Sequence, residues 1–97
     1  NLYNLINMAN LRVIKKDVIY LINEVISDCW VFMYLNNEAK QDEAKQIITD
    51  AVALGDNLFD QINHYPKEET KKHFKQVNEK LLAEVDALFK RISALAK

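Results

Sequence analysis

The sequence is poor in the residues that interrupt regular structure. Gly55 is the single glycine and Pro66 the single proline among 97 residues. A turn-rich β fold needs several of each, because they supply the backbone angles of tight turns. A glycine-rich phosphate-binding loop also needs more than one glycine. These absences favour a chain of long helices and exclude the common nucleotide-binding motifs.

Cysteine and charge of one sign are scarce as well. Cys29 is the only cysteine, so the chain can form neither an internal disulfide nor a Cys-x-x-Cys metal site. The net charge is −1 with acids and bases interspersed, whereas a nucleic-acid-binding domain carries a strong basic field. We therefore expect no nucleic-acid partner. With 49% hydrophobic residues the composition is that of one folded domain over residues 1–97.

Apolar residues recur every three or four positions in three segments, which is the period of an α-helix. We expect helices at about residues 9–35, 38–63 and 67–96. Asn36 and Asn37 separate the first two, and Pro66 separates the last two, because proline fits the first turn of a new helix. Connections this short make consecutive helices antiparallel. The predicted fold is an all-α, up-down-up three-helix bundle with coiled-coil-like packing.

Each predicted helix has an apolar stripe that we expect to face the core. We expect Leu82 and Phe89 to widen the stripe of the third helix, and Gly55 to let a neighbouring backbone approach the second. The stripes consist of Leu11, Ile14, Val18, Leu21, Ile22, Val25, Cys29 and Phe32; of Ala44, Ile47, Ile48, Ala51, Leu54, Leu58, Ile62 and Tyr65; and of Phe74, Val77, Leu81, Val85, Leu88, Ile92 and Leu95.

Residues 1–8, NLYNLINM, are open to two interpretations. They either extend the first helix backward or form an irregular arm. Met8 followed by Ala9 has the form of a native start, in which case residues 1–7 would not be native. Asn10 is a candidate N-cap for a helix that begins at Leu11.

The acidic and histidine side chains do not form a pattern that supports catalysis or metal binding. Asp17, Glu24 and Asp28 share one line on the first helix, where we expect them to pair with lysines of a neighbouring helix. A di-metal site in a helical bundle also needs Glu-x-x-His pairs, and the sequence contains none. Glu69 and His73 are four residues apart, but two ligands make a weak metal site. We expect an exposed polar pair and no metal.

Nucleophilic catalysis finds no support in the sequence either. Cys29 lies on an apolar face, where we expect a buried structural thiol rather than a reactive one. No Ser-His-acid arrangement points to a single site, and His64 lies in a predicted turn. We therefore predict a protein that is not an enzyme, with no catalytic residues and no cofactor.

The outer face of the first helix is unusual. Arg12, Lys16, Asn23 and Ser27 form a solvated face, yet large apolar residues lie on or beside it. Either the other helices cover Trp30, or this face contacts a second copy or another protein, because aromatic residues are enriched in such contacts. The candidate interaction surface is Ile19, Trp30, Met33 and Tyr34. We expect a homodimer through Trp30, Phe32, Met33 and Tyr34.

The predicted function is therefore a non-enzymatic protein–protein interaction or structural module. A small-ligand-binding bundle with a site between helices is the alternative. The uninterrupted apolar run, residues 29–35, is far shorter than the ~20 residues of a membrane span, and Asn23, Glu24 and Asp28 interrupt any longer run. With no signal peptide visible, we expect a cytoplasmic protein without membrane contact.

Two segments, MANLRVIKKDVIYLINEVISDC from Met8 and VDALFKRIS near the end, resemble small bacterial all-helical proteins of unknown function. The resemblance covers most of the chain from Met8 onward. It implies an independently encoded single helical domain. It carries no activity and no functional residues.

Overall fold

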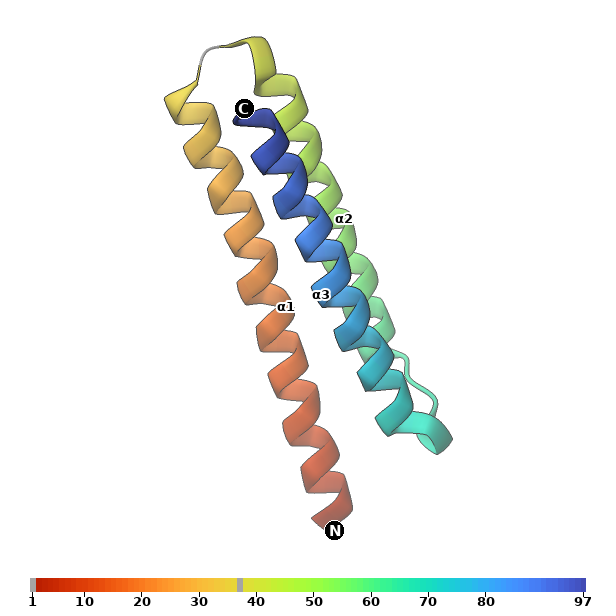
Figure 1. Cartoon of the computed structure of the whole chain (residues 1–97). Coiled ribbons are helices and arrows are strands. Elements are labelled where there is room, and N and C mark those ends of the chain that lie inside the picture. The colour runs from red at the N-terminus through yellow and green to blue at the C-terminus, as the bar shows by residue number, and fades with distance from the viewer. Residues whose placement is uncertain (1, 37) are drawn as a thin grey trace.

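A computed structural model describes the backbone of residues 2–36 and 38–97, and the side chains of residues 11–36, 38 and 40–97. These residues form helices α1 (Leu2–Leu35), α2 (Gln41–Asn63) and α3 (Thr70–Leu95), with short 3₁₀ turns η1 (Glu38–Lys40) and η2 (Lys67–Glu69) before α2 and α3. Figure 1 shows α1 and α3 running in one direction and α2 in the other. All three helices pack against each other, which confirms the predicted all-α three-helix bundle.

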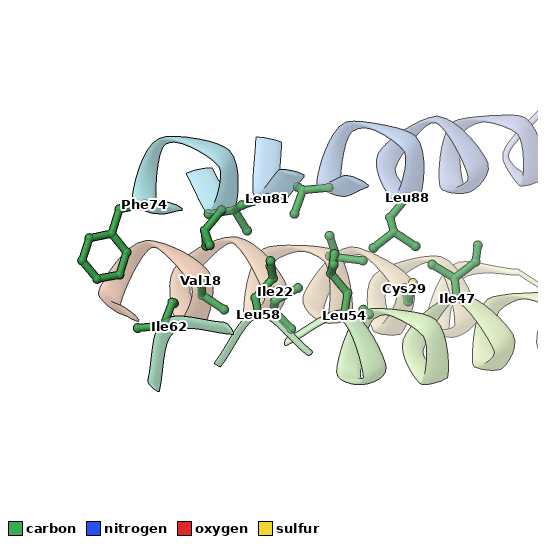
Figure 2. Packing of buried hydrophobic residues seen from close by; sticks show 14 residues of the cluster. Val18, Ile22, Cys29, Ile47, Leu54, Leu58, Ile62, Phe74, Leu81 and Leu88 are labelled. Carbon is green, nitrogen blue, oxygen red and sulfur yellow. The ribbon is translucent and has the colours of Figure 1, made fainter. Parts of the chain in front are cut away.

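The core is a single cluster that runs the length of the bundle. Each helix contributes one stripe of buried residues at spacings of three and four, and Figure 2 shows the three stripes converging on a common axis. The stripes are Val18, Ile22, Val25, Cys29 and Phe32 of α1; Ala44, Ile47, Ala51, Leu54, Leu58 and Ile62 of α2; and Phe74, Val77, Leu81, Val85 and Leu88 of α3. The central parts of all three predicted stripes are confirmed.

One predicted contribution to the core is wrong. Leu82 is 54% exposed on α3, because it lies one residue past Leu81 and a step of about 100° turns it away from the other two helices. Phe89 is half-buried and packs against the core cluster, as expected. The buried stripe of α3 is therefore narrower than the stripe of hydrophobic residues in its sequence.

The first helix begins earlier than predicted. Its backbone is helical from Leu2 rather than from about residue 9, so of the two interpretations of residues 1–8 the backward extension holds for the backbone from Leu2. Asn10 lies inside the helix and is not an N-cap. In Figure 1 the first turns of α1 continue past the α2–α3 connection. The expectations for Asn1 and for the side chains of residues 2–10 lie outside the described residues.

Polar side chains close both ends of the bundle. At one end the Lys40 ammonium donates to the carbonyl of Leu95 at 2.7 Å, where a cation also complements the C-terminal dipole of α3. Nearby, Asn36 Nδ2 donates to the Phe32 carbonyl at 2.8 Å and so caps the end of α1. At the other end, the buried Thr70 hydroxyl donates to the Lys67 carbonyl at 3.1 Å. Each connection is thus held by hydrogen bonds.

One ion pair joins α2 to α3 on the surface. The Arg91 guanidinium lies 2.8 Å from the Asp50 carboxylate. The hydrogen bond from Arg91, and a second one from Gln46, hold the pKa of Asp50 below its ordinary value. The contribution of this pair to stability is lost as the pH falls through that lowered pKa. It is small, because exposed ion pairs are screened by solvent.

The adjacent leucines Leu81 and Leu82 test the core assignment. Leu81 is 0% exposed and Leu82 is 54% exposed. We expect Leu81→Ala to lower the free energy of unfolding by about 2–5 kcal/mol, because it leaves a cavity among packed side chains. Leu82→Ala should change it by less than ~1 kcal/mol. Urea unfolding of both variants measures the difference, and equal losses would show that the core is misplaced.

Gly55 does not make the close backbone approach that the sequence indicates. A Cβ atom at this position would lie 3.6 Å from Ile22 Cγ1, an ordinary contact with a side chain. Its φ is not positive, so alanine adopts the same backbone without strain. We expect Gly55→Ala to raise the free energy of unfolding by about 0.5–1 kcal/mol, because alanine is the better helix former. A loss of stability in urea unfolding would show that the α1–α2 contact is tighter than these distances.

Candidate functional site

The outer face of α1 differs from the outer faces of α2 and α3. A helix in a three-helix bundle packs against two neighbours, so one arc of its surface stays outside. In α2 and α3 this arc is mainly polar. Among the described side chains, α1 carries seven of the nine exposed large hydrophobic residues, whereas α2 and α3 carry Val52 and Leu82. The seven are Val13, Ile19, Tyr20, Trp30, Val31, Tyr34 and Leu35.

The exposed apolar residues gather at the C-terminal end of α1. We call Trp30, Val31, Tyr34 and Leu35 the aromatic end. Trp30 is 59% exposed and Tyr34 is 89% exposed, so the interpretation in which the bundle covers Trp30 is wrong. These four residues lie beside the buried stripe of α1. They belong to the uninterrupted hydrophobic run of residues 29–35, so this end of the helix is hydrophobic on every side. Contiguous apolar surface of this kind is typical of an interaction site.

The structure brings together most of the predicted interaction surface. Ile19, Trp30 and Tyr34 are exposed on the same side of α1. Met33 is half-buried at the edge of that side, and its carbonyl accepts a hydrogen bond from Gln41 Nε2 at 2.8 Å. Phe32 was expected in a dimer contact, but it is only 7% exposed and belongs to the core stripe. It lies two positions from Trp30, a step of about 200° around the helix.

Charge is unevenly distributed along the outer face. Arg12, Lys15 and Lys16 lie in its N-terminal half, and residues 17–35 contain neither lysine nor arginine. Asp17, Glu24 and Asp28 are exposed along one flank. Among the described side chains, no ion pair includes these three acids. The expected pairing with lysines of a neighbouring helix is therefore wrong, and the acids face solvent.

The histidines interact with backbone carbonyls at two places. His73 Nε2 lies 2.6 Å from the Gln61 carbonyl and joins α3 to α2. Its ring also packs 5.7 Å from that of Phe74, so the predicted exposed pair with Glu69 is wrong. His64 Nδ1 lies 3.0 Å from the Asp60 carbonyl at the end of α2. Within the part of the chain that the structure describes, no group of three or more metal-ligating residues comes together.

Cys29 is buried, as predicted, and its position makes it unreactive. Burial raises the pKa of its thiol above the ordinary value; the Asp28 carboxylate raises it further, and the Arg91 guanidinium offsets part of the rise. The thiolate is the nucleophilic form of cysteine. A thiol that is both buried and held in its protonated form is therefore a poor nucleophile.

We expect Cys29 in the folded protein to react with a disulfide reagent at least about tenfold more slowly than in urea, because access requires opening of the core. Colorimetric titration with and without urea at pH 8 measures the ratio. The folded state also retains the thiol proton at a higher pH than the unfolded chain does. Stability should therefore fall as the pH rises through the alkaline range. Equal rates in both states would contradict the burial of Cys29.

A groove lies between α1 and α2. Its volume is about 250 Å³, slightly below the range of typical ligand pockets. The absent side chain of Gly55 leaves part of its floor open. The groove is lined by Val18, Ile19, Ile22, Asn23 and Ile26 of α1 and by Val52, Gly55, Asp56 and Phe59 of α2.

By length and composition, the segment Leu11–Leu35 of α1 is apolar enough to cross a membrane. The core helix of a soluble protein and a signal sequence near the N-terminus pass the same test, and the buried residues of this segment pack against α2 and α3. Insertion of α1 into a bilayer would remove Val18, Val25 and Cys29 from that core. It would also place Glu24 and Asp28 in hydrocarbon, which is costly.

Comparison with known proteins adds no further information about the site. No protein family, curated protein or solved structure matches this chain. The resemblance to small bacterial helical proteins stays a prediction.

Proposed function

We propose that this chain is a non-enzymatic protein–protein interaction module whose docking surface is the outer face of α1. The observation that carries this proposal is the concentration of exposed large hydrophobic residues on one helix, and above all the aromatic end. The exposed apolar residues of α2 and α3 are single, and single exposed residues are ordinary in folded proteins. The same explanation does not extend to four neighbouring residues that include Trp30 and Tyr34.

The free energy available at this surface is sufficient for recognition. Large aromatic side chains bury about 150–250 Å² each in protein contacts. Covering the exposed part of one such residue therefore yields on the order of 3 kcal/mol before the costs of association. Trp30 and Tyr34 lie one helical turn apart, so a single partner surface reaches both. Tryptophan and tyrosine are also the residues that most often dominate binding energy at interfaces.

The chemistry of the remaining side chains supports a non-enzymatic role. Cys29 is buried with a raised pKa, and both histidines interact with backbone carbonyls within their own bundle. The groove between α1 and α2 is lined by no serine, threonine, cysteine, lysine or histidine, so it does not pair a nucleophile with a base, the minimum arrangement for nucleophilic catalysis. The outer face of α1 provides apolar contact area instead.

The docking surface is tested by comparing two substitutions of exposed apolar residues. The chain and its Trp30→Ser and Leu82→Ser variants are immobilised and exposed to an extract of the source cells. We expect Trp30→Ser to lower the amount of retained protein at least about tenfold, because a central aromatic contributes about 1.4 kcal/mol or more. Leu82→Ser should retain the wild-type amount, since Leu82 is comparably exposed but lies on α3.

Circular dichroism of both variants provides the control for folding. Each substitution removes an exposed apolar residue, so both variants should keep the helical signal and melting temperature of the parent within a few degrees. If Trp30→Ser unfolds the chain, Trp30 belongs to the core and the docking surface is misplaced. If both variants retain the same amount of protein as the parent, the outer face of α1 is not the docking surface.

The groove between α1 and α2 supports a second candidate function, the binding of a small apolar ligand. A helix-interior glycine is destabilising relative to alanine, and Gly55 keeps the groove open. In this reading Asp56 would orient a ligand with a positive or hydrogen-bond-donating end. A ligand that co-purifies with the parent chain and is lost in Gly55→Leu would favour this function over protein docking.

A further inference from the structure

The outer face of α1 contains one straight row of exposed residues. We call this row the outer stripe; its successive members are three or four positions apart, so they lie within an arc of about 80°. All of its members are exposed. It consists of Arg12, Lys16, Ile19, Asn23, Ser27, Trp30 and Tyr34.

The outer stripe is symmetric in position about Asn23. Arg12 and Tyr34 each lie eleven residues from Asn23, and Lys16 and Trp30 each lie seven residues from it. The two halves are chemically different. The N-terminal half carries the cations and the C-terminal half carries the aromatic rings. Cations are attracted to the faces of aromatic rings, so the two halves are complementary.

We propose that the outer stripe binds a second copy of this chain, with the two α1 helices antiparallel and Asn23 on the twofold axis. This inference rests on the proposed function and names its partner. The twofold axis places Lys16 against Trp30 of the partner subunit, and Arg12 against Tyr34 of the partner subunit. Each contact then occurs twice, as in closed symmetric dimers. Lysine and arginine over aromatic faces form favourable cation–π contacts.

A shallow, open hollow lies on the N-terminal half of the outer stripe, around Lys16, Ile19 and Asn23. The twofold axis brings Trp30 of the partner subunit to this hollow. An aromatic side chain seated between the residues of a facing helix is the packing that antiparallel helix pairs use. Its lining is Arg12, Lys15, Lys16, Ile19, Tyr20, Asn23 and Glu24.

The same residues disfavour a parallel dimer. In a parallel pair in register, Arg12 and Lys16 would face their own copies, and like charges across an interface repel. Asn23 meets its own copy when it lies on the twofold axis, and its amide can both donate to and accept from that copy. This pairing favours the register over arrangements shifted along the helix, and the cations set the direction.

A second copy fits the outer stripe better than a membrane surface does. Anionic lipids attract lysine and arginine, but residues 17–35 contain neither. Glu24 and Asp28 are exposed beside that segment, so an anionic surface would repel it. From Arg12 to Tyr34 the stripe is roughly 33 Å long at 1.5 Å per residue. Two such faces bury on the order of 1,000 Å², the lower limit for a specific interface.

Light scattering over a range of concentrations tests whether the chain binds a second copy of itself. We expect the mass to rise from 11.3 kDa to twice that value as the concentration increases. Lys16→Ala should weaken the dimer several-fold, because it removes the cation opposite the indole. Lys75→Ala should leave it unchanged, since Lys75 is exposed on α3, away from the outer stripe and its hollow. A mass that stays monomeric up to millimolar concentration overturns the inference.

Cysteine cross-linking then tests the direction of the two helices. Ile19→Cys and Ser27→Cys are made separately in a Cys29→Ala background, mixed and oxidised. The twofold axis places residue 19 opposite residue 27 of the second copy. We therefore expect mixed disulfide dimers to exceed like-with-like dimers at least about tenfold. An excess of like-with-like dimers would indicate a parallel pair and overturn the antiparallel arrangement.

The two proposals fail in different ways. The parent chain could be monomeric and capture another protein, with that capture lost in Trp30→Ser. This result would overturn the second copy and keep the outer face of α1 as a docking surface. Sedimentation of the parent, but not of Trp30→Ser, with phosphatidylcholine–phosphatidylglycerol vesicles overturns both proposals in favour of a lipid surface. Circular dichroism of each variant verifies that the helical fold is retained.

Discussion

The structure depends on the mutual burial of three apolar stripes, none of which can be buried without the other two. A single helix of this length gains little from its own hydrogen bonds in water, and most of its stability comes from tertiary packing. Residues spaced three and four apart place one stripe of each helix on the common axis. The arrangement has a geometric limit, because three helices cover only the inner arc of each. Whatever chemistry a helix carries on its outer arc stays on the surface.

This limit explains which parts of the molecule could be predicted from the sequence. The three core stripes and the two connections follow from periodicity and from Pro66, because they depend on local spacing. The exposure of Leu82 depends on where the neighbouring helices lie, and periodicity alone does not give that. The early start of α1 stayed one of two interpretations, because the asparagine-rich residues before Leu11 lack a clear helical stripe.

The candidate site was predicted in part, for a related reason. Trp30 and Tyr34 were recognised because they interrupt an otherwise polar arc of the first helix. Whether the bundle covers them required the placement of α2 and α3. The hydrogen bond from Lys40 to the carbonyl of Leu95 joins residues 55 positions apart. No local sequence signal marks Lys40, since a lysine after a predicted turn is ordinary.

The contact of Lys40 with the last turn of α3 has a consequence for cooperativity. Isolated helices fray from their ends, where backbone carbonyls lack partners. Here the final turn of the described chain is tied to the connection between the first two helices. Loss of that turn therefore also frees the start of α2. Amide protons at this end of the molecule should exchange as one group with shared protection, rather than with the graded protection of three separate helix termini.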